Sequence, residues 1–486
     1  MLDFITLCDG YKLDHRRQFP VGTQRIYSNF TPRGSRVAGQ EKVVFFGLQY
    51  FLNEYLGRLA NETFFAQPKA QVLAKYQRLL DRYFGPNDIG VRHIADLHDY
   101  GRIPLEFFAL PEGTHVPLRC PMFTLMNTHD DFFWMTNYIE TILSSVIWHA
   151  CTSATTAYRY RRLLDNFAER TGGAKEFVQW QAHDFSFRGL SGPEAAAMSG
   201  AGHLLSFTGT DTVPAIQLLE EHYDATGLIG GSVPATEHAV MCAGSRESEM
   251  QTFDRLLKLY PNGIVSVVSD TWDLWNVVEH TLPALKERIM ARNGKLVVRP
   301  DSGVPEDILT GDPAAPAGTA AREGLIGCLW KIFGGTVNAK GFRELDPHIG
   351  AIYGDSITEQ RAQEICQRLE AKGFASTNVV LGIGSFTYQY VTRDTFGFAI
   401  KATWARVNDE GRELYKDPAT DSGVKKSARG MLVIVKNNKG AIEMRDGLNE
   451  TQRRAEGQDL LAPVWREGKL LQRQTLEQVR ARVRAG

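Results

Sequence analysis

Six short polar segments carry most of the residues in this sequence that could do chemistry, and each is expected to follow an apolar strand. Their Asp and Arg side chains could bind hydroxyl groups, a hydrated Mg²⁺ ion or phosphates, and their glycines could present backbone N–H groups to an anion. A series of this kind is typical of a barrel of parallel strands, whose active site lies at the carboxyl ends of the strands. The segments are residues 183–189, 209–211, 269–270, 299–303, 354–356 and 382–385.

Two carboxylates are the strongest catalytic candidates. Asp270 and Asp301 each come directly after a predicted buried strand, so both are expected at the same mouth of the barrel. There they could bind ribose hydroxyls, hold Mg²⁺ through water or stabilise a cationic sugar transition state. Each could equally well cap the helix that follows it. Arg299, two residues before Asp301, favours a functional role for the set.

Small residues at two other strand ends indicate a phosphate site. Gly354, Asp355 and Ser356 form one group, and residues 382–385, which include Gly384, form the other. A tight turn is the commoner meaning of each, but barrels of this type often bind phosphate near their last strands. The basic residues that could close over such a site, each more typical of solvated surface when taken alone, are Arg393, Lys401, Lys416, Lys425 and Lys426.

One histidine and three aromatic residues complete the candidates. His238 is expected near a helix N-terminus, where a neutral imidazole could accept a phosphoryl group or act as a base, although a capping or core role is the commoner one for a single such histidine. A flat heteroaromatic ligand could stack on Tyr11 or Phe185, whereas core packing is preferred for Phe187. The chain has no GxSxG, HExxH or GxxxxGK[ST] motif, so serine hydrolases, zinc proteases and P-loop enzymes have no support.

Composition excludes several other classes of protein. A length of 486 residues predicts two or three domains. A net charge of −1 provides no overall positive electrostatic field that would attract nucleic acid or an anionic membrane. The six scattered cysteines predict reduced thiols rather than disulfides or a metal site. Residues 132–148 are apolar but interrupted by polar residues, and the N-terminus lacks a basic signal segment. We expect a cytoplasmic protein without a membrane span.

The order of the expected elements favours an α/β fold with an irregular (β/α) barrel and a flanking β-rich α+β domain. Expected strands include 177–180, 204–207, 263–268 and 295–298, with helices over 131–170 and from 232 onward. Outside the barrel we expect helices at 50–59, 70–84 and 475–483 and a hairpin near 431–440. The expected divisions are 1–130, 131–390 and 391–486, of which the first and last could form one composite domain.

Read together, the segments resemble the nicotinamide phosphoribosyltransferase family, within the type II phosphoribosyltransferases. The likeness extends from about Leu7 nearly to the C-terminus and includes residues 8–12, 183–189, 209–212, 232–238, 266–270, 299–303, 354–355, 392–394 and 415–418. It implies transfer of phosphoribosyl from phosphoribosyl pyrophosphate to nicotinamide, which yields nicotinamide mononucleotide and pyrophosphate in NAD salvage. It also implies a requirement for Mg²⁺, ATP hydrolysis coupled through a phosphohistidine, and a homodimer with shared active sites.

The resemblance also implies roles for individual residues. Phe185 and Tyr11 of the partner subunit would sandwich the pyridine ring, while Asp211 and Arg299 would lie at the carboxamide. Asp270 and Asp301 would contact the ribose or the Mg²⁺ ion through water. No residue is expected to coordinate Mg²⁺ directly. His238 would be the phosphorylated histidine. The phosphates would be held by Arg33, Arg188, Gly354, Asp355, Gly384, Arg393, Lys401 and Lys416.

Two rival functions remain open from the sequence. A nicotinate phosphoribosyltransferase would share the barrel and the phosphate site, but the carboxylate of Asp211 argues against it because it would repel nicotinate. A non-catalytic ligand-binding or signalling protein would not need the complete set of Asp, Arg and His residues at the strand ends. The chain departs from the family at residues 382–386, where Ile383 and Phe386 make the loop poorer in glycine than expected.

Overall fold

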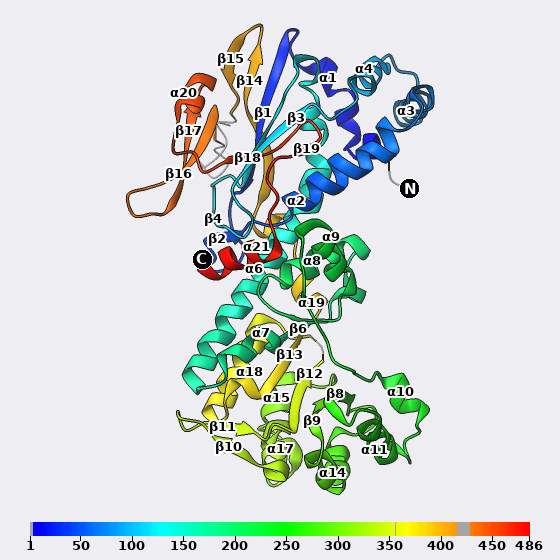
Figure 1. Cartoon of the computed structure of the whole chain (residues 1–486), viewed down its shortest axis with the longest axis vertical. Coiled ribbons are helices and arrows are strands. Elements are labelled where there is room, and N and C mark those ends of the chain that lie inside the picture. Colours follow the sequence, from blue (N-terminus) through cyan, green and yellow to red (C-terminus); the bar gives the residue numbers. More distant parts are fainter. Residues whose placement is uncertain (1–2, 355, 416–427) are drawn as a thin grey trace. The chain divides into compact units, whose positions relative to one another are not determined.

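The computed structural model describes residues 3–354, 356–415 and 428–486, so Asp355, Lys416, Lys425 and Lys426 lie outside the described residues. Contacts divide the chain into two compact units (Figure 1). The barrel unit comprises Thr156–Gln217 and Thr226–Tyr390. The flanking unit comprises Met1–Thr155, Leu218–Ala225 and Val391–Gly486.

Six parallel strands form the sheet of the barrel unit, in the order β7-β6-β13-β12-β9-β8. The segment between residues 231 and 236 joins its two edges, because Gly231 bridges to Gly209 of β7 and Ala235 bridges to Ser266 of β8. The sheet thus closes into the expected irregular barrel. The strands are β6 Ala182–Asp184, β7 Gly209–Thr210, β8 Asn262–Val268, β9 Asn293–Arg299, β12 Ile349–Tyr353 and β13 Val379–Ile383.

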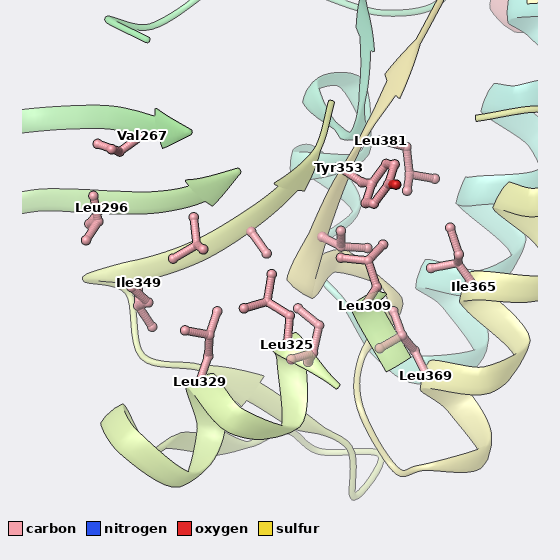
Figure 2. Packing of buried hydrophobic residues seen from close by; sticks show 14 of the residues in the cluster. Val267, Leu296, Leu309, Leu325, Leu329, Ile349, Tyr353, Ile365, Leu369 and Leu381 are labelled. Atoms are coloured by element: carbon pink, nitrogen blue, oxygen red, sulfur yellow. The ribbon is translucent and has the colours of Figure 1, made fainter. Parts of the chain in front are cut away.

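Alternation along β9 shows how one strand serves both core and site. Leu296 and Val298 are fully buried in the hydrophobic core, whereas Lys295, Val297 and Arg299 line a cavity inside the barrel. Figure 2 shows Leu296 and its neighbours packing toward helices α15 (Pro305–Thr310), α17 (Leu325–Phe333) and α18 (Glu359–Ala371). Burial of each such aliphatic side chain contributes ~1.5–3 kcal/mol to the stability of the fold. This packing holds the strands in place, and with them the polar residues at the strand ends.

Two expected strands and one expected helix of the barrel unit were wrong in detail. Residues 177–180 contribute to a helical turn, α7 (Val178–Gln181), and the strand itself is β6. Residues 204–207 continue the end of α8 (Pro193–His203), since the N–H of Leu204 donates to the carbonyl of Gly200. A short apolar run does not distinguish these conformations. The helix expected from 232 begins later, as α10 (His238–Ala243) and α11 (Glu249–Leu259).

An antiparallel sheet of seven strands organises the flanking unit, in the order β15-β14-β1-β5-β3-β18-β19. Three N-terminal strands, β1, β5 and β3, form its centre, and C-terminal strands flank them on both sides. Phe30 of β1 stacks on Phe123 of β5 and Phe398 of β14 at 5.0 and 5.2 Å between ring centroids. The strands are β1 Thr23–Pro32, β3 Leu105–Ala109, β5 Phe123–Asn127, β14 Phe398–Val407, β15 Glu410–Glu413, β18 Ala462–Arg466 and β19 Lys469–Leu470.

Several expected elements around this sheet are confirmed. They are α3 (Lys69–Phe84), α6 (Glu140–Thr171), α21 (Leu476–Ala485) and the hairpin of β16 (Met431–Lys436) and β17 (Ile442–Leu448). The six cysteines, all within the described ranges, are free thiols. Among the helices that the structure describes, none has both the length and the apolar character needed to cross a bilayer.

Candidate functional site

Aromatic and charged side chains from neighbouring strand ends form a slot in the barrel unit, which we call the base slot (Phe185, Asp211, Arg299 and His183). Phe185 follows β6, and its ring lies 4.5 Å from that of His183, centroid to centroid. The guanidinium of Arg299, at the end of β9, lies 5.0 Å from the centroid of the Phe185 ring. A cation this close to an aromatic face is attracted to it, and the contact orients both groups. The slot can therefore hold a flat ring with a polar substituent.

Asp211 supplies the carboxylate of the base slot. Its Oδ1 lies 2.9 Å from Nε2 of His183, and its side chain remains 43% exposed, so part of it faces the cavity. Burial raises the pKa of Asp211, but the hydrogen bond and charge of His183, the Ser232 hydroxyl and the charge of Arg299 outweigh burial and hold the pKa below its usual value. The side chain is consequently an ionised acceptor near neutral pH.

The base slot opens into a cavity of about 580 Å³ inside the barrel. Apolar side chains such as Trp180, Val297 and Ile352 line it together with His183, Asp211 and Arg299. A pyridine ring fills only part of this space. The polar groups of the slot therefore sit at one region of a mostly apolar chamber, the arrangement typical of a small-molecule site.

Gly382 leaves space for the Phe185 ring of the base slot, and a larger residue at this position should displace that ring. It pairs with His183 across β13 and β6, and a Cβ at this position would lie 2.6 Å from the carbonyl oxygen of Tyr353 and 2.9 Å from the Phe185 ring. Gly382→Ala is therefore expected to raise KM for the ring substrate by about tenfold, a loss of ~1.4 kcal/mol. Steady-state kinetics would measure it, with Gly457→Ala as control, because nothing lies within 4 Å of a Cβ there.

Asp270, Asp301 and His238 form a second cluster at the ends of β8 and β9 and at the start of α10, with one ligand atom of each lying within 4.8 Å of the others. His238 Nε2 is 3.3 Å from both carboxylate oxygens of Asp301, and its Nδ1 is 3.2 Å from the Thr271 hydroxyl. The His238 side chain is 46% exposed and so is open to a large ligand.

The arrangement of the two carboxylates is suited to binding Mg²⁺ and is not explained by a structural role alone. Asp270 Oδ2 accepts hydrogen bonds from the backbone N–H groups of Asp301 and Ser302, at 2.9 and 2.8 Å, which holds the two loops together. Its other oxygen, Oδ1, is buried and has no hydrogen-bond partner among the residues that the structure describes. An unpaired buried carboxylate oxygen beside a second carboxylate suits a hard, hydrated cation, whereas the imidazole of His238 does not attract Mg²⁺.

The expected phosphate residues of the barrel unit lie at adjacent strand ends. A Cβ at Gly354 would lie 3.1 Å from the Cβ of Asp301 and 3.0 Å from Nε of Arg299, so this turn adjoins both clusters. Gly384 precedes α19 (Ser385–Tyr388), and Arg188 belongs to the exposed turn Phe187–Gly189, whose Gly189 packs closely on Ser385. Of the two residues in which this loop departs from the family, Ile383 is buried in the core and the Phe386 side chain is exposed.

The remaining expected residues gather in the flanking unit, around a polar cavity of about 350 Å³. The loop that carries Tyr11 is tied to α6, because Lys12 donates to Glu140 at 2.7 Å and the Thr141 hydroxyl donates to Asp9 at 2.7 Å. The Tyr11 ring itself is 59% exposed. The predicted residues that line this cavity are Tyr11, Arg33, Arg393 and Lys401.

Sequence analysis did not assign a role to His183 or Thr271, and it placed Gly382 only in the candidate phosphate turn. His183 and Phe185 are two residues apart and share a face of the strand, which was the available signal for His183. Thr271 follows Asp270 directly, and this adjacency to a predicted site residue was the available signal for Thr271. The need for a glycine at 382 depends on the position of the Phe185 ring and leaves no trace in the local sequence.

An α/β barrel unit with a parallel sheet, together with a β-rich α+β unit, is the fold that this chain shares with pyridine phosphoribosyltransferases. Residues 180–460 match the nicotinate phosphoribosyltransferase (NAPRTase) family, and residues 3–107 match the N-terminal domain of nicotinamide phosphoribosyltransferase. Two solved structures share the fold: a nicotinate-nucleotide pyrophosphorylase from Pyrococcus furiosus (TM-score 0.59, 14% identity, 99% of this chain and 95% of that chain) and human nicotinic acid phosphoribosyltransferase (0.58, 14%, 98% and 91%).

Curated relatives narrow the class to one family. The chain is 52% identical to a nicotinamide phosphoribosyltransferase of Acinetobacter baylyi, over 98% of this chain and 96% of the relative. It is 35% identical to one of Xanthomonas campestris, over 97% and 96%. The chain belongs to the nicotinamide phosphoribosyltransferase family and is an enzyme.

Proposed function

We propose that this enzyme transfers the phosphoribosyl group of phosphoribosyl pyrophosphate to the ring nitrogen of nicotinamide, giving nicotinamide mononucleotide and pyrophosphate in NAD salvage. The observation that carries the choice of base is the ionised Asp211 at the base slot. A carboxylate accepts a hydrogen bond from the N–H₂ of a carboxamide, whereas it repels the carboxylate of nicotinate. Relatives named nicotinamide phosphoribosyltransferase support the same choice.

Asp270 and Asp301 would provide the charge stabilisation that the reaction needs. Nicotinamide is a neutral, weak nucleophile, so the transfer depends on positive character at C1 of the ribose and on stabilisation of the leaving pyrophosphate. Asp270 and Asp301 would stabilise that positive character and hold the hydrated Mg²⁺, which supplies charge neutralisation of pyrophosphate when bound. Phe185 and Arg299 would orient the ring toward C1.

Phosphate binding would draw on both units of the chain. Gly354, Asp355 and Gly384 would hold the 5′-phosphate through backbone groups, and Arg188 would approach the same anion. From the family resemblance, the polar cavity of the flanking unit would serve the active site of a second subunit, with the pyridine ring stacked on Tyr11 of the partner subunit. The basic residues contributed in this way would be Arg33, Arg393, Lys401 and Lys416.

His238 would couple ATP hydrolysis to this transfer. A neutral ring nitrogen would attack the γ-phosphorus of ATP, the bond to ADP would break, and water would later release the phosphoryl group as inorganic phosphate. The side chain of His238 is 46% exposed and lies 3.3 Å from Asp301, which supports this role because a phosphoryl group on His238 would lie close to the two carboxylates. We further propose that the enzyme acts in the cytoplasm as a homodimer, without a nucleic-acid or membrane partner.

Replacing His238 by alanine is expected to abolish the stimulation by ATP while measurable ATP-independent transfer remains. The reason is that the phosphoryl acceptor is lost, whereas the base slot and both carboxylates are kept. Mononucleotide formation with and without ATP would measure the first effect, and labelled ATP would reveal acid-labile phosphate on the protein. The exposed His280 provides a control variant, His280→Ala. Acid-labile phosphate that persisted on the His238→Ala protein would contradict this role.

One assay tests the function as a whole. The enzyme is supplied with phosphoribosyl pyrophosphate and Mg²⁺ and with nicotinamide or nicotinate, each with and without ATP. We expect mononucleotide and pyrophosphate from nicotinamide in preference to nicotinate. Efficient use of nicotinate instead would indicate the other pyridine transferase, and no pyrophosphate with either base would indicate a binding protein.

A further inference from the structure

His183 contacts Asp211 from inside the barrel, and the proposed reaction gives it no role so far. Its side chain is only 11% exposed, and its Nε2 lies 2.9 Å from Asp211 Oδ1. Its ring also lies against Phe185, with centroids 4.5 Å apart. A Cβ at Gly209, on the neighbouring strand β7, would come within 2.8 Å of Nδ1. A glycine there leaves the space that the imidazole occupies, so the ring is confined on two sides.

This arrangement fixes both the orientation of Asp211 and the tautomer of His183. Because Nε2 faces a carboxylate oxygen, Nε2 carries a proton and donates the hydrogen bond to Asp211. A carboxylate has about four acceptor positions on its two oxygens. The hydrogen bond from His183 uses one of them and holds the group in place, while the exposed part of Asp211 can accept from a ligand.

We propose that His183 is a positioning residue that orients Asp211 and thereby helps to set the preference for an amide over a carboxylate substituent. The inference rests on the proposed transfer to nicotinamide and adds to it a determinant of specificity. His183 would touch neither C1 of the ribose nor the leaving group. Its effect would pass through Asp211.

Several titratable groups surround His183. Asp211 and Arg299 face it across the base slot, Asp184 follows it on β6, and His203 lies behind it on α8. Burial lowers the pKa of His203 to about 4, so that ring stays neutral near neutral pH. From β13, the residue paired with His183 is Gly382, which does not titrate. Lys295 and Glu344 line the same cavity, and burial lowers the pKa of Lys295.

The sign of the effect follows from the role of Asp211. Its carboxylate accepts from an amide substituent and repels a carboxylate substituent, and the hydrogen bond from His183 holds it in the orientation that does both. Removing this donor should therefore lower the selectivity for nicotinamide by about tenfold, the order expected for the loss of one hydrogen bond.

Competition between the two bases isolates this effect. The full-length enzyme receives nicotinamide and nicotinate together with one pool of phosphoribosyl pyrophosphate, Mg²⁺ and ATP, and the ratio of the two mononucleotides is measured at one pH for the wild type and each variant. Any loss of folded enzyme changes both products alike and cancels in the ratio. A His183→Ala enzyme with the wild-type ratio would overturn the proposal.

Three variants distinguish positioning from a general structural role. His183→Gln keeps an N–H donor near Nε2, so it should retain most of the selectivity. His183→Ala removes the donor and should lose it. His348→Gln is the matched control, because His348 forms another His–Asp pair, with Asp346 at 2.7 Å, outside the base slot; it should keep the wild-type product ratio.

Each failure has its own meaning. A His183→Gln enzyme that lost as much selectivity as His183→Ala would contradict a role through the donated hydrogen bond. Wild-type enzyme that makes no nicotinamide mononucleotide would instead overturn the proposed function. Thermal unfolding of each variant confirms that the product ratios come from folded protein.

Discussion

Asp301→Asn is expected to lower kcat/KM for phosphoribosyl transfer by about 10²- to 10³-fold, equivalent to ~3–4 kcal/mol of transition-state stabilisation. The substitution removes one negative charge next to the expected position of the ribose and its metal, while the shape of the side chain is nearly unchanged. The side chain of Asp301 contacts His238, and its backbone N–H is bound by Asp270. The loop should therefore keep its conformation.

The measurement separates the ribose role from the ATP role. Initial rates are taken without ATP, so that any change in the phosphorylation of His238 does not contribute, and the Mg²⁺ concentration for half-maximal rate is determined for both proteins. Asp307→Asn serves as a control for loss of an acidic charge on the adjacent helix α15, where Asp307 pairs with Arg368 at 2.7 Å. An Asp301→Asn enzyme with wild-type kcat/KM and an unchanged Mg²⁺ requirement would exclude Asp301 from the transition state.

The sequence predicted the site best where chemistry and secondary structure coincide. Asp270 and Asp301 follow strands with strongly apolar patterns, β8 and β9, so their meeting at one mouth followed from parallel strand geometry. Tyr11 and Arg33 could be assigned only through the family resemblance, because nothing in their local sequence connects them to a barrel.

The parts that were missed depend on tertiary contacts. β7 has two residues, Gly209–Thr210, and no apolar pattern, so the preceding apolar run was mistaken for the strand. The closure of the barrel uses single bridges at Gly231 and Ala235, which no periodicity indicates. The pairing of His183 with Asp211 depends on the register of two short strands, and a shift by one residue would have turned His183 away from the site.

Asp211→Ala is expected to lower kcat/KM for nicotinamide by about 10- to 100-fold and to relax the discrimination against nicotinate. Loss of a charge-assisted hydrogen bond costs ~1.5–3 kcal/mol, which accounts for the first effect. The second effect follows because the repulsion of the nicotinate carboxylate disappears, while Arg299 remains beside the slot at 5.0 Å from the Phe185 centroid. Both values come from kcat/KM measured separately for the two bases at one pH.

Asp211→Asn separates the hydrogen bond from the charge. The amide of asparagine retains an acceptor oxygen of nearly the same geometry, so nicotinamide use should suffer less than in Asp211→Ala, but the repulsion of nicotinate should be lost to the same extent. If instead both variants left the ratio of the two kcat/KM values at its wild-type value, Asp211 would not set the choice of base. Discrimination would then have to come from the apolar lining of the cavity, which disfavours any charged substituent irrespective of its partner.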